Sequence, residues 1–220
     1  MFVVVQKHEY KMYSALLDQS FRPRKRVFFD RLGWDVPVEG NRERDAYDDL
    51  GPAYLMWCDA AANTLYGTVR LMPTTGPTLL FDVFRSTFPD VALSAPGVWE
   101  GTRMCIDEFA IQRDFPDLSP ARAFSFLLLA LCECGIDHGI HTLVSNYEPH
   151  FRRIYQRAGL HVTELGRSDK FGRFPVCCGV FDVTDEVRHK MRRVLNVVGP
   201  LYQNRRGRPA PETASYRLSA

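Results

Sequence analysis

The chain has 220 residues, of which 45% are hydrophobic and 25% charged, and its formal net charge is +2. This composition is typical of a globular domain and excludes collagen-like and disordered chains. The longest nearly unbroken apolar run, residues 124–132, is far shorter than the about 20 residues that cross a bilayer, so we expect no membrane span. The small net charge argues against nucleic-acid binding.

The N-terminus and the cysteines indicate the compartment. Residues 1–10 lack the basic start, apolar core and cleavage site of a secretory signal, so we expect a cytoplasmic protein. The six cysteines fit neither a disulfide framework nor the spacing of zinc ligands. We therefore expect reduced, mostly buried thiols and no metal site.

Strands and helices are predicted along most of the chain. Apolar alternation and β-branched content predict strands at 2–6, 54–59, 65–74, 98–106, 141–145, 161–164 and 174–182. Apolar residues at helical spacing predict helices near 10–17, 22–32, 120–134, 151–158 and 185–197. This order of elements favours a single α/β (α+β) domain that spans residues 1–198 and contains a mixed sheet with helices on both faces. Residues 199–220 are predicted to be a polar tail.

Residues 34–50 are polar, acidic and interrupted by Pro37 and Gly40, which predicts a long loop. Its carboxylates Glu43, Asp45 and Asp48 have two interpretations. Charged loop residues usually face only water. Alternatively, they converge on a cation such as an ammonium or sulfonium, with an aromatic face supplied by Phe28, Trp34 or Tyr47.

Three charged residues occur in otherwise apolar predicted strands: Arg70, Glu100 and Arg103. Buried charges need partners, so these residues form either structural ion pairs or part of a functional site. Strict alternation places Glu100 and Arg103 on opposite faces of their strand. If both face one site, a bulge is required, and we expect it at Gly101.

Five short motifs occur in order between Arg24 and Arg103. They are R-x3-F-x5-W at Arg24, Phe28 and Trp34; E-x-D-x2-D at Glu43, Asp45 and Asp48; RLMPTT from Arg70; LLFDVF at 79–84; and WEGTR at 99–103. This ordered set resembles the LuxI-type acyl-homoserine lactone synthases, which make quorum-sensing signals (autoinducers). The later segment 143–160 resembles the same family less tightly, so the likeness extends to about residue 165.

The resemblance implies a fold similar to the GNAT-type N-acetyltransferases and an acyltransferase reaction without a permanently bound cofactor. S-adenosylmethionine (SAM) would be a co-substrate. Its α-amino group would attack an acyl thioester, and its carboxylate would then displace methylthioadenosine to close a lactone. The acyl donor would be an acyl carrier protein or acyl-CoA, attracted by basic surfaces at Arg152, Arg153, Arg157 and 188–193. The alternative is that these are ordinary solvated helix faces.

The resemblance also implies roles for individual residues. The SAM side would comprise Arg24, Phe28, Trp34, Asp45 and Asp48. The catalytic group would comprise Glu100 as general base, directly or through water, with Arg70 and Arg103 binding the SAM carboxylate or fixing the acidic loop. A backbone N–H of the bulged strand would polarise the thioester carbonyl. The acyl pocket would include Thr102, Met104, Thr142 and Ser145.

Departures from the family pattern leave the length of the acyl chain open, because Thr102 stands where Ser is common and Met104 where Phe is common. Asn146 and Tyr147 differ from what is expected in the straight-chain enzymes, so a branched or aryl group is also compatible with the sequence. Two other functions also remain open. One is a GNAT-like N-acyltransferase that acts on another amine without lactonisation, and the other is a binding module with an inactive site.

Overall fold

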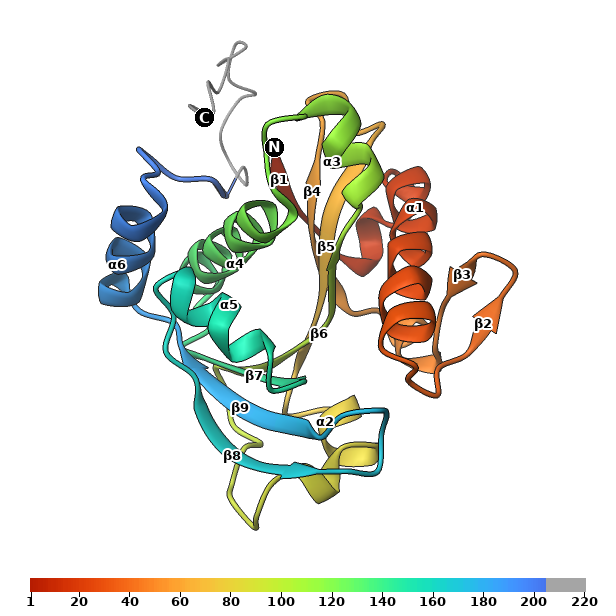
Figure 1. Ribbon diagram of the computed structural model, residues 1–220, viewed down its shortest axis with the longest axis vertical. Coiled ribbons are helices and arrows are strands. Elements are labelled where there is room, and N and C mark those ends of the chain that lie inside the picture. The colour runs from red at the N-terminus through yellow and green to blue at the C-terminus, as the bar shows by residue number, and fades with distance from the viewer. Residues whose placement is uncertain (205–220) are drawn as a thin grey trace.

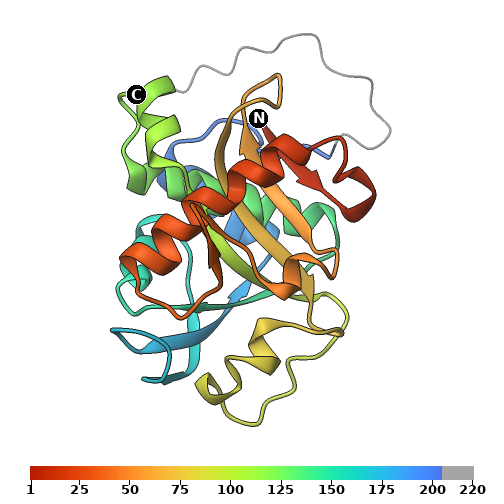
Figure 2. The same ribbon diagram turned by 90° about the vertical axis from the view of Figure 1, so that its right-hand side faces the viewer.

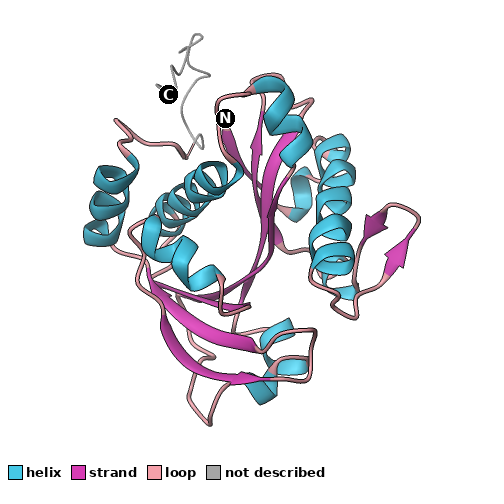
Figure 3. Ribbon diagram, viewed as in Figure 1, coloured by secondary structure: helices cyan, strands magenta, loops and turns pink. Residues whose placement is uncertain are grey.

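The structure, a computed structural model, describes residues 1–204 and has a seven-stranded sheet at its centre (Figures 1 and 3). The strand order is β1-β4-β5-β6-β7-β9-β8, and every neighbouring pair is antiparallel except β6 with β7. The strands are β1 (Phe2–Val5), β4 (Ala53–Cys58), β5 (Leu65–Pro73), β6 (Val98–Ile106), β7 (Thr142–Tyr147), β8 (Thr163–Ser168) and β9 (Val176–Asp182). The predicted mixed sheet is therefore confirmed.

Helices cover both faces of this sheet, as predicted (Figures 1 and 2). On one face lies α1 (Ser14–Arg24), and on the other lie α4 (Pro120–Asp137), α5 (Phe151–Arg157) and α6 (Asp185–Leu195). Two short helices, α2 (Leu79–Asp82) and α3 (Glu108–Asp114), were not predicted. No helix within residues 1–204 is long and apolar enough to cross a membrane.

The central helix α4 forms the main core with the sheet because it is apolar on nearly every side. Its N-terminus is capped by the Ser119 side chain, which accepts the Arg122 backbone N–H, and Pro120 lies in the first turn. Val69 and Leu71 of β5 point toward this core, so the intervening Arg70 points to the opposite face. Arg70 is thereby directed away from the main core.

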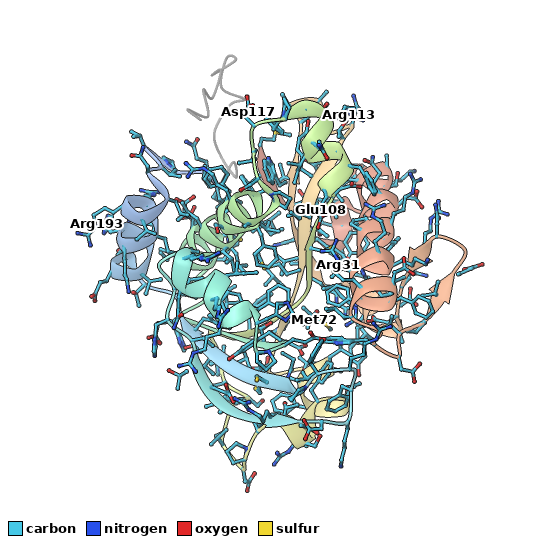
Figure 4. The ribbon with its side chains drawn as sticks, in the orientation of Figure 1. Arg31, Met72, Glu108, Arg113, Asp117 and Arg193 are labelled. Atoms are coloured by element: carbon cyan, nitrogen blue, oxygen red, sulfur yellow. The ribbon has the colours of Figure 1, made fainter. Side chains whose placement is uncertain are left out.

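The predicted break between two N-terminal helices is absent. Instead, α1 continues directly into a π-helix, Lys25–Arg31, although Pro23 lies inside the helical segment. Two ion pairs hold the π-helix against the start of α3. Arg26 pairs with Asp107 at 2.8 Å, and Arg31 pairs with Glu108 at 2.9 Å (Arg31 and Glu108 are labelled in Figure 4). The wider turns of the π-helix determine which of its side chains are buried, and Phe28 is one of them.

Residues 34–50 are more ordered than an open loop. They form the small pair β2 (Val38–Glu39) and β3 (Arg42–Glu43), followed by a 3₁₀ turn at Ala46–Asp48. The Asp45 side chain caps this turn by accepting the Tyr47 backbone N–H. The acidic residues are thereby held against the sheet.

The beginning of the predicted tail packs on the domain. Backbone N–H groups of Leu201 and Tyr202 both donate to Glu133 of α4 at 2.8 Å, and Tyr202 belongs to the main core. The rest of the tail, residues 205–220, lies outside the described part. All six cysteines are buried, as predicted.

Candidate active site

Six charged residues form a closed ionic cluster beneath β5 and β6. Its members are Arg24, Glu43, Asp45, Asp48, Arg70 and Arg103, and each is at most 8% exposed. Three arginines therefore face three carboxylates. The cluster is neutral as a whole, which is the condition under which buried charges are tolerated.

Arg24 and Arg70 are engaged through all their guanidinium nitrogens. Arg24 donates to both oxygens of Asp48 at 2.8 and 2.9 Å and also to Glu43. Arg70 donates to Asp45, to Asp48 and to the Thr102 hydroxyl. These contacts fix the acidic segment against the sheet, and none of the nitrogens is left over for a ligand.

Asp48 lies at the centre of this arrangement. Besides the two arginines, it accepts the Tyr54 hydroxyl at 2.6 Å and the Asp45 backbone N–H at 2.9 Å. Burial raises the pKa of Asp48, but the hydrogen bonds and charges of Arg24 and Arg70 outweigh burial, and its pKa lies below the ordinary value. Asp48 is therefore a charged anchor at neutral pH.

Arg103 differs from the other two arginines because it also lines a cavity. Its Nε donates to Glu43 and its Nη2 to Asp45, both at 3.0 Å. Its Nη1 donates no hydrogen bond within residues 1–204. The guanidinium carbon lies 5.2 Å from the centre of the Phe28 ring, close enough for a cation–π contact.

A β-bulge brings Glu100 and Arg103 to the same face, but it is not at Gly101 as expected. The β5–β6 register runs from Arg70 opposite Thr102 to Thr68 opposite Cys105, so the extra residue lies at Arg103–Met104. Arg103 has φ of 54°, a left-handed conformation that is uncommon for a residue with a side chain. The strain is held by its two ion pairs with the acidic segment.

Glu100 is completely buried beside this cluster. One carboxylate oxygen accepts the Leu79 backbone N–H at 3.1 Å, and the other, Oε1, has no hydrogen-bond partner among residues 1–204. Burial raises the pKa of Glu100 to about 7, although Arg70 and nearby backbone N–H groups oppose this shift. Such a carboxyl group can exchange a proton near neutral pH.

The cavity opens where β6 and β7 diverge. The two strands pair only from Val98 to Glu100 and from Thr142 to Val144, and the cavity is lined by the residues that follow in each strand. Its volume is about 90 Å³. The Ser145 hydroxyl donates to the Gly101 carbonyl at 2.8 Å across the gap, at the point where the ladder ends.

One end of the cavity has an aromatic wall. Phe28 and Trp34 lie with ring centres 5.5 Å apart, and Phe84 follows Trp34 at 5.6 Å. At the other end, aliphatic and aromatic side chains form an apolar chamber between α4, α5 and β9. Its lining includes Phe124, Leu128, Leu131, Phe151, Tyr155 and Phe181.

Most of the predicted acyl-pocket residues are found on this cavity. Thr102, Met104 and Ser145 line it, together with Phe28, Trp34 and Arg103 from the other predicted groups. Thr142 does not line it, although its neighbour Leu143 does. Asp45, Asp48 and Arg24 lie in the ionic cluster behind the wall and do not line it either.

Sequence reasoning did not identify several residues that line the cavity. Phe84 lies in the LLFDVF motif and Tyr155 in the helix predicted near 151–158, but neither side chain carries a charge that would indicate a site. Glu148 was also missed. It is only 1% exposed and accepts the Trp34 indole N–H at 3.2 Å.

The sequence profile of the autoinducer synthase family matches residues 8–191. This chain belongs to the autoinducer synthase family. An acyl-homoserine-lactone synthase from Rhizobium etli is 37% identical over 191 residues, which cover 83% of this chain and 86% of the relative. A second synthase, from Agrobacterium fabrum, is 33% identical and covers 77% of this chain and 80% of the relative. The family suggested by the motifs is confirmed.

Solved structures agree with this family in fold. The CoA-dependent acyl-homoserine lactone synthase BjaI, with SAM and isopentyl-CoA, has a TM-score of 0.76 at 23% identity and covers 93% of each chain. An N-acetyltransferase structure from Lactobacillus plantarum has a TM-score of 0.51 at 17% identity, covering 83% of this chain and 99% of that chain. The predicted likeness of this autoinducer synthase to the N-acetyltransferase fold is thus confirmed.

Proposed function

We propose that this chain is an acyl-homoserine lactone synthase that joins SAM to an acyl thioester. The supporting observation is a cavity that the β6 bulge lines and whose two ends differ in character. The aromatic end, at Phe28 and Trp34, suits the adenosyl and sulfonium parts of SAM. The apolar chamber beyond Ser145 suits an acyl chain.

The first chemical step is acylation of the SAM α-amino group. Arg103 offers its free Nη1 to the SAM carboxylate, while its other nitrogens remain bound to the acidic segment. Glu100 removes the proton from the α-ammonium through water, because its own side chain does not line the cavity. The neutral amine attacks the thioester carbonyl, an amide forms, and the carrier thiol leaves.

The bulge contributes to this step through its backbone. Arg103 and Met104 are the extra residues in the β5–β6 register and both line the cavity, so their backbone lies beside it. A backbone N–H in this position stabilises the negative charge that develops on the thioester oxygen. Ser145 keeps β7 at a fixed distance from this point through its bond to Gly101.

The second step closes the ring. The SAM carboxylate attacks the γ-carbon, the carbon–sulfur bond breaks, and neutral methylthioadenosine leaves with the bonding electrons. The sulfonium makes this possible because it becomes a neutral thioether. Water exclusion by the apolar walls favours attack by the carboxylate over hydrolysis.

The acyl donor is an acyl carrier protein or acyl-CoA thioester. Both are anionic, and the exposed arginines of α5 suit either of them. The acyl chamber accepts the chain, with Thr102, Met104 and Ser145 at its entrance, and Thr142 stays a predicted contact outside the cavity. Six buried cysteines and the proposed substrates, SAM and an acyl thioester, suit a cytoplasmic enzyme.

The test is a reaction of the full chain with SAM and a panel of acyl-CoA and acyl-carrier-protein thioesters. Mass spectrometry is expected to detect an acyl-homoserine lactone and an equimolar amount of methylthioadenosine. Acyl transfer to another amine without methylthioadenosine would favour the GNAT-like N-acyltransferase. Failure to bind or consume SAM would overturn the proposal.

A further inference from the structure

Glu148 is a buried carboxylate that the proposed mechanism does not use. It follows β7 directly, is 1% exposed, and lines the cavity beside Trp34. No lysine or arginine within residues 1–204 lies within ion-pair distance of it. Its nearest basic group is the His150 imidazole, 3.4 Å from Oε2, and that side chain is 56% exposed.

This lack of a cationic partner distinguishes Glu148 from the carboxylates of the ionic cluster. Glu43, Asp45 and Asp48 are matched by three arginines and have no charge to offer a ligand. An isolated buried carboxylate is costly unless something pairs with it. A ligand cation would supply that partner.

The hydrogen bonds of Glu148 indicate the kind of cation. Oε1 accepts one N–H, from Trp34, and no hydrogen bond to Oε2 is found within the described residues. A carboxylate can accept about four hydrogen bonds, so most of its capacity is unused. An ammonium has three N–H groups that can donate hydrogen bonds to these free acceptor positions, whereas a sulfonium has no hydrogen-bond donor.

We propose that Glu148 binds the α-ammonium group of SAM and that Trp34 orients its carboxylate. This inference rests on the proposed function, since it assumes that SAM occupies the cavity. Glu148, Trp34, Phe28 and Arg103 form one continuous wall, each in contact with the next. The wall therefore presents a negative group and a positive group to a substrate whose amino-acid end carries both charges.

The experiment compares three ligands by isothermal titration calorimetry on the wild type and Glu148→Gln. SAM has an ammonium and a sulfonium, S-adenosylhomocysteine has only the ammonium, and methylthioadenosine has neither. Loss of a charged hydrogen bond is expected to weaken SAM and S-adenosylhomocysteine about 10- to 100-fold. Affinity for methylthioadenosine should be unchanged, which also shows that the variant is folded.

Other outcomes overturn the assignment. If only SAM weakens, Glu148 faces the sulfonium, and if all three ligands weaken equally, it contacts the ribose or acts structurally. Unchanged SAM affinity in Glu148→Gln, with lactone still made by the wild type, would reject the inference and leave the proposed function standing. A wild type that neither binds SAM nor makes lactone would reject the proposed function itself.

Two further variants serve as controls. Glu39→Gln removes the same charge from the exposed strand β2 and should leave the affinity for all three ligands unchanged. Trp34→Phe removes the N–H donor to Glu148 but keeps an aromatic ring. It should weaken S-adenosylhomocysteine more than methylthioadenosine if Trp34 acts by orienting the carboxylate, and equal weakening of both would reject that role.

Discussion

Two adjoining regions on β6 differ in how they use charge. The ionic cluster contains six charged residues that satisfy one another, whereas the cavity contains few charges and leaves them partly unsatisfied. Arg103 belongs to both regions. The comparison indicates that most of the conspicuous charged residues build the site, while largely uncharged neighbours contact the substrates.

The largest effect is expected from breaking the ionic cluster at Asp48. Asp48→Ala leaves Arg24, Arg70 and the Tyr54 hydroxyl buried without a shared acceptor. Removing one member of a buried ion pair costs about 3–5 kcal/mol of unfolding free energy. We expect lactone formation to be lost together with stability, as measured by urea unfolding.

An exposed ion pair provides the matched control. Asp18 pairs with Arg42 on the surface, and Asp18→Ala should cost less than about 1 kcal/mol. If Asp48→Ala lost activity at unchanged unfolding free energy, Asp48 would contact a substrate directly. The division between a structural cluster and a substrate cavity would then be wrong.

Glu100→Gln tests the junction of the two regions. The substitution keeps the shape of the side chain and removes the base, so kcat should fall about 10²- to 10⁴-fold while SAM affinity is nearly unchanged. In the wild type, kcat/KM should rise with pH up to about 7 and then level off, because only the deprotonated carboxylate accepts a proton. A Glu100→Gln variant with the same rise would exclude Glu100 as the base.

The same residue makes a prediction about stability. The folded-state pKa of Glu100 lies above its ordinary value, so the folded protein binds more protons than the unfolded chain between these two values. Stability contributed by protonated Glu100 is therefore fully present at lower pH and is lost as pH rises toward about 7. Urea unfolding of Glu100→Gln should show a smaller decline over this range, and an unchanged decline would assign it to other groups.

The sequence predicted the parts of this site that depend on local pattern. Strict alternation in β6 placed Glu100 and Arg103 on opposite faces, so a bulge was required to bring them to one site, and the structure contains one. The position of the bulge could not be predicted. Glycine is common at bulges, so we expected it at Gly101, but it lies at Arg103–Met104. The ion pairs of Arg103 instead hold a non-glycine residue in a left-handed conformation.

Other features depend on contacts between distant segments. Glu148 and Trp34 are separated by 114 positions, and nothing near either residue in the sequence indicates their hydrogen bond. Likewise, Asp45 and Asp48 looked like cation ligands until their three arginine partners were visible. Residue type and spacing thus predicted that these residues belong to the site. Only the packing of distant segments showed which of the charges remain free to bind a ligand.

A smaller effect is expected at Gly101, which lines the cavity. A β-carbon added there would lie 3.9 Å from the nearest atoms of Val69 and Leu71, an ordinary contact, so substitution should not disturb the fold. Gly101→Val fills space at the mouth of the acyl chamber. We expect kcat/KM to fall about tenfold more for octanoyl-CoA than for butanoyl-CoA. Gly101→Ala should give a smaller difference, and equal losses for both donors would place the acyl chain elsewhere.

The smallest effect is expected on the surface, where charges attract a donor without contacting the reacting atoms. Arg152, Arg153 and Arg157 are exposed on α5, and Arg193 projects from α6 away from the sheet (Figure 4). Replacing the three α5 arginines by glutamine should lower kcat/KM for the acyl donor several-fold at low salt, mainly through slower association. The difference should shrink as salt screens the charges. If kcat/KM falls with acyl carrier protein but not with acyl-CoA, the arginines form a protein-docking face. If it falls with acyl-CoA but not with acyl carrier protein, they bind the CoA phosphates. If it falls with neither donor, this is an ordinary solvated surface.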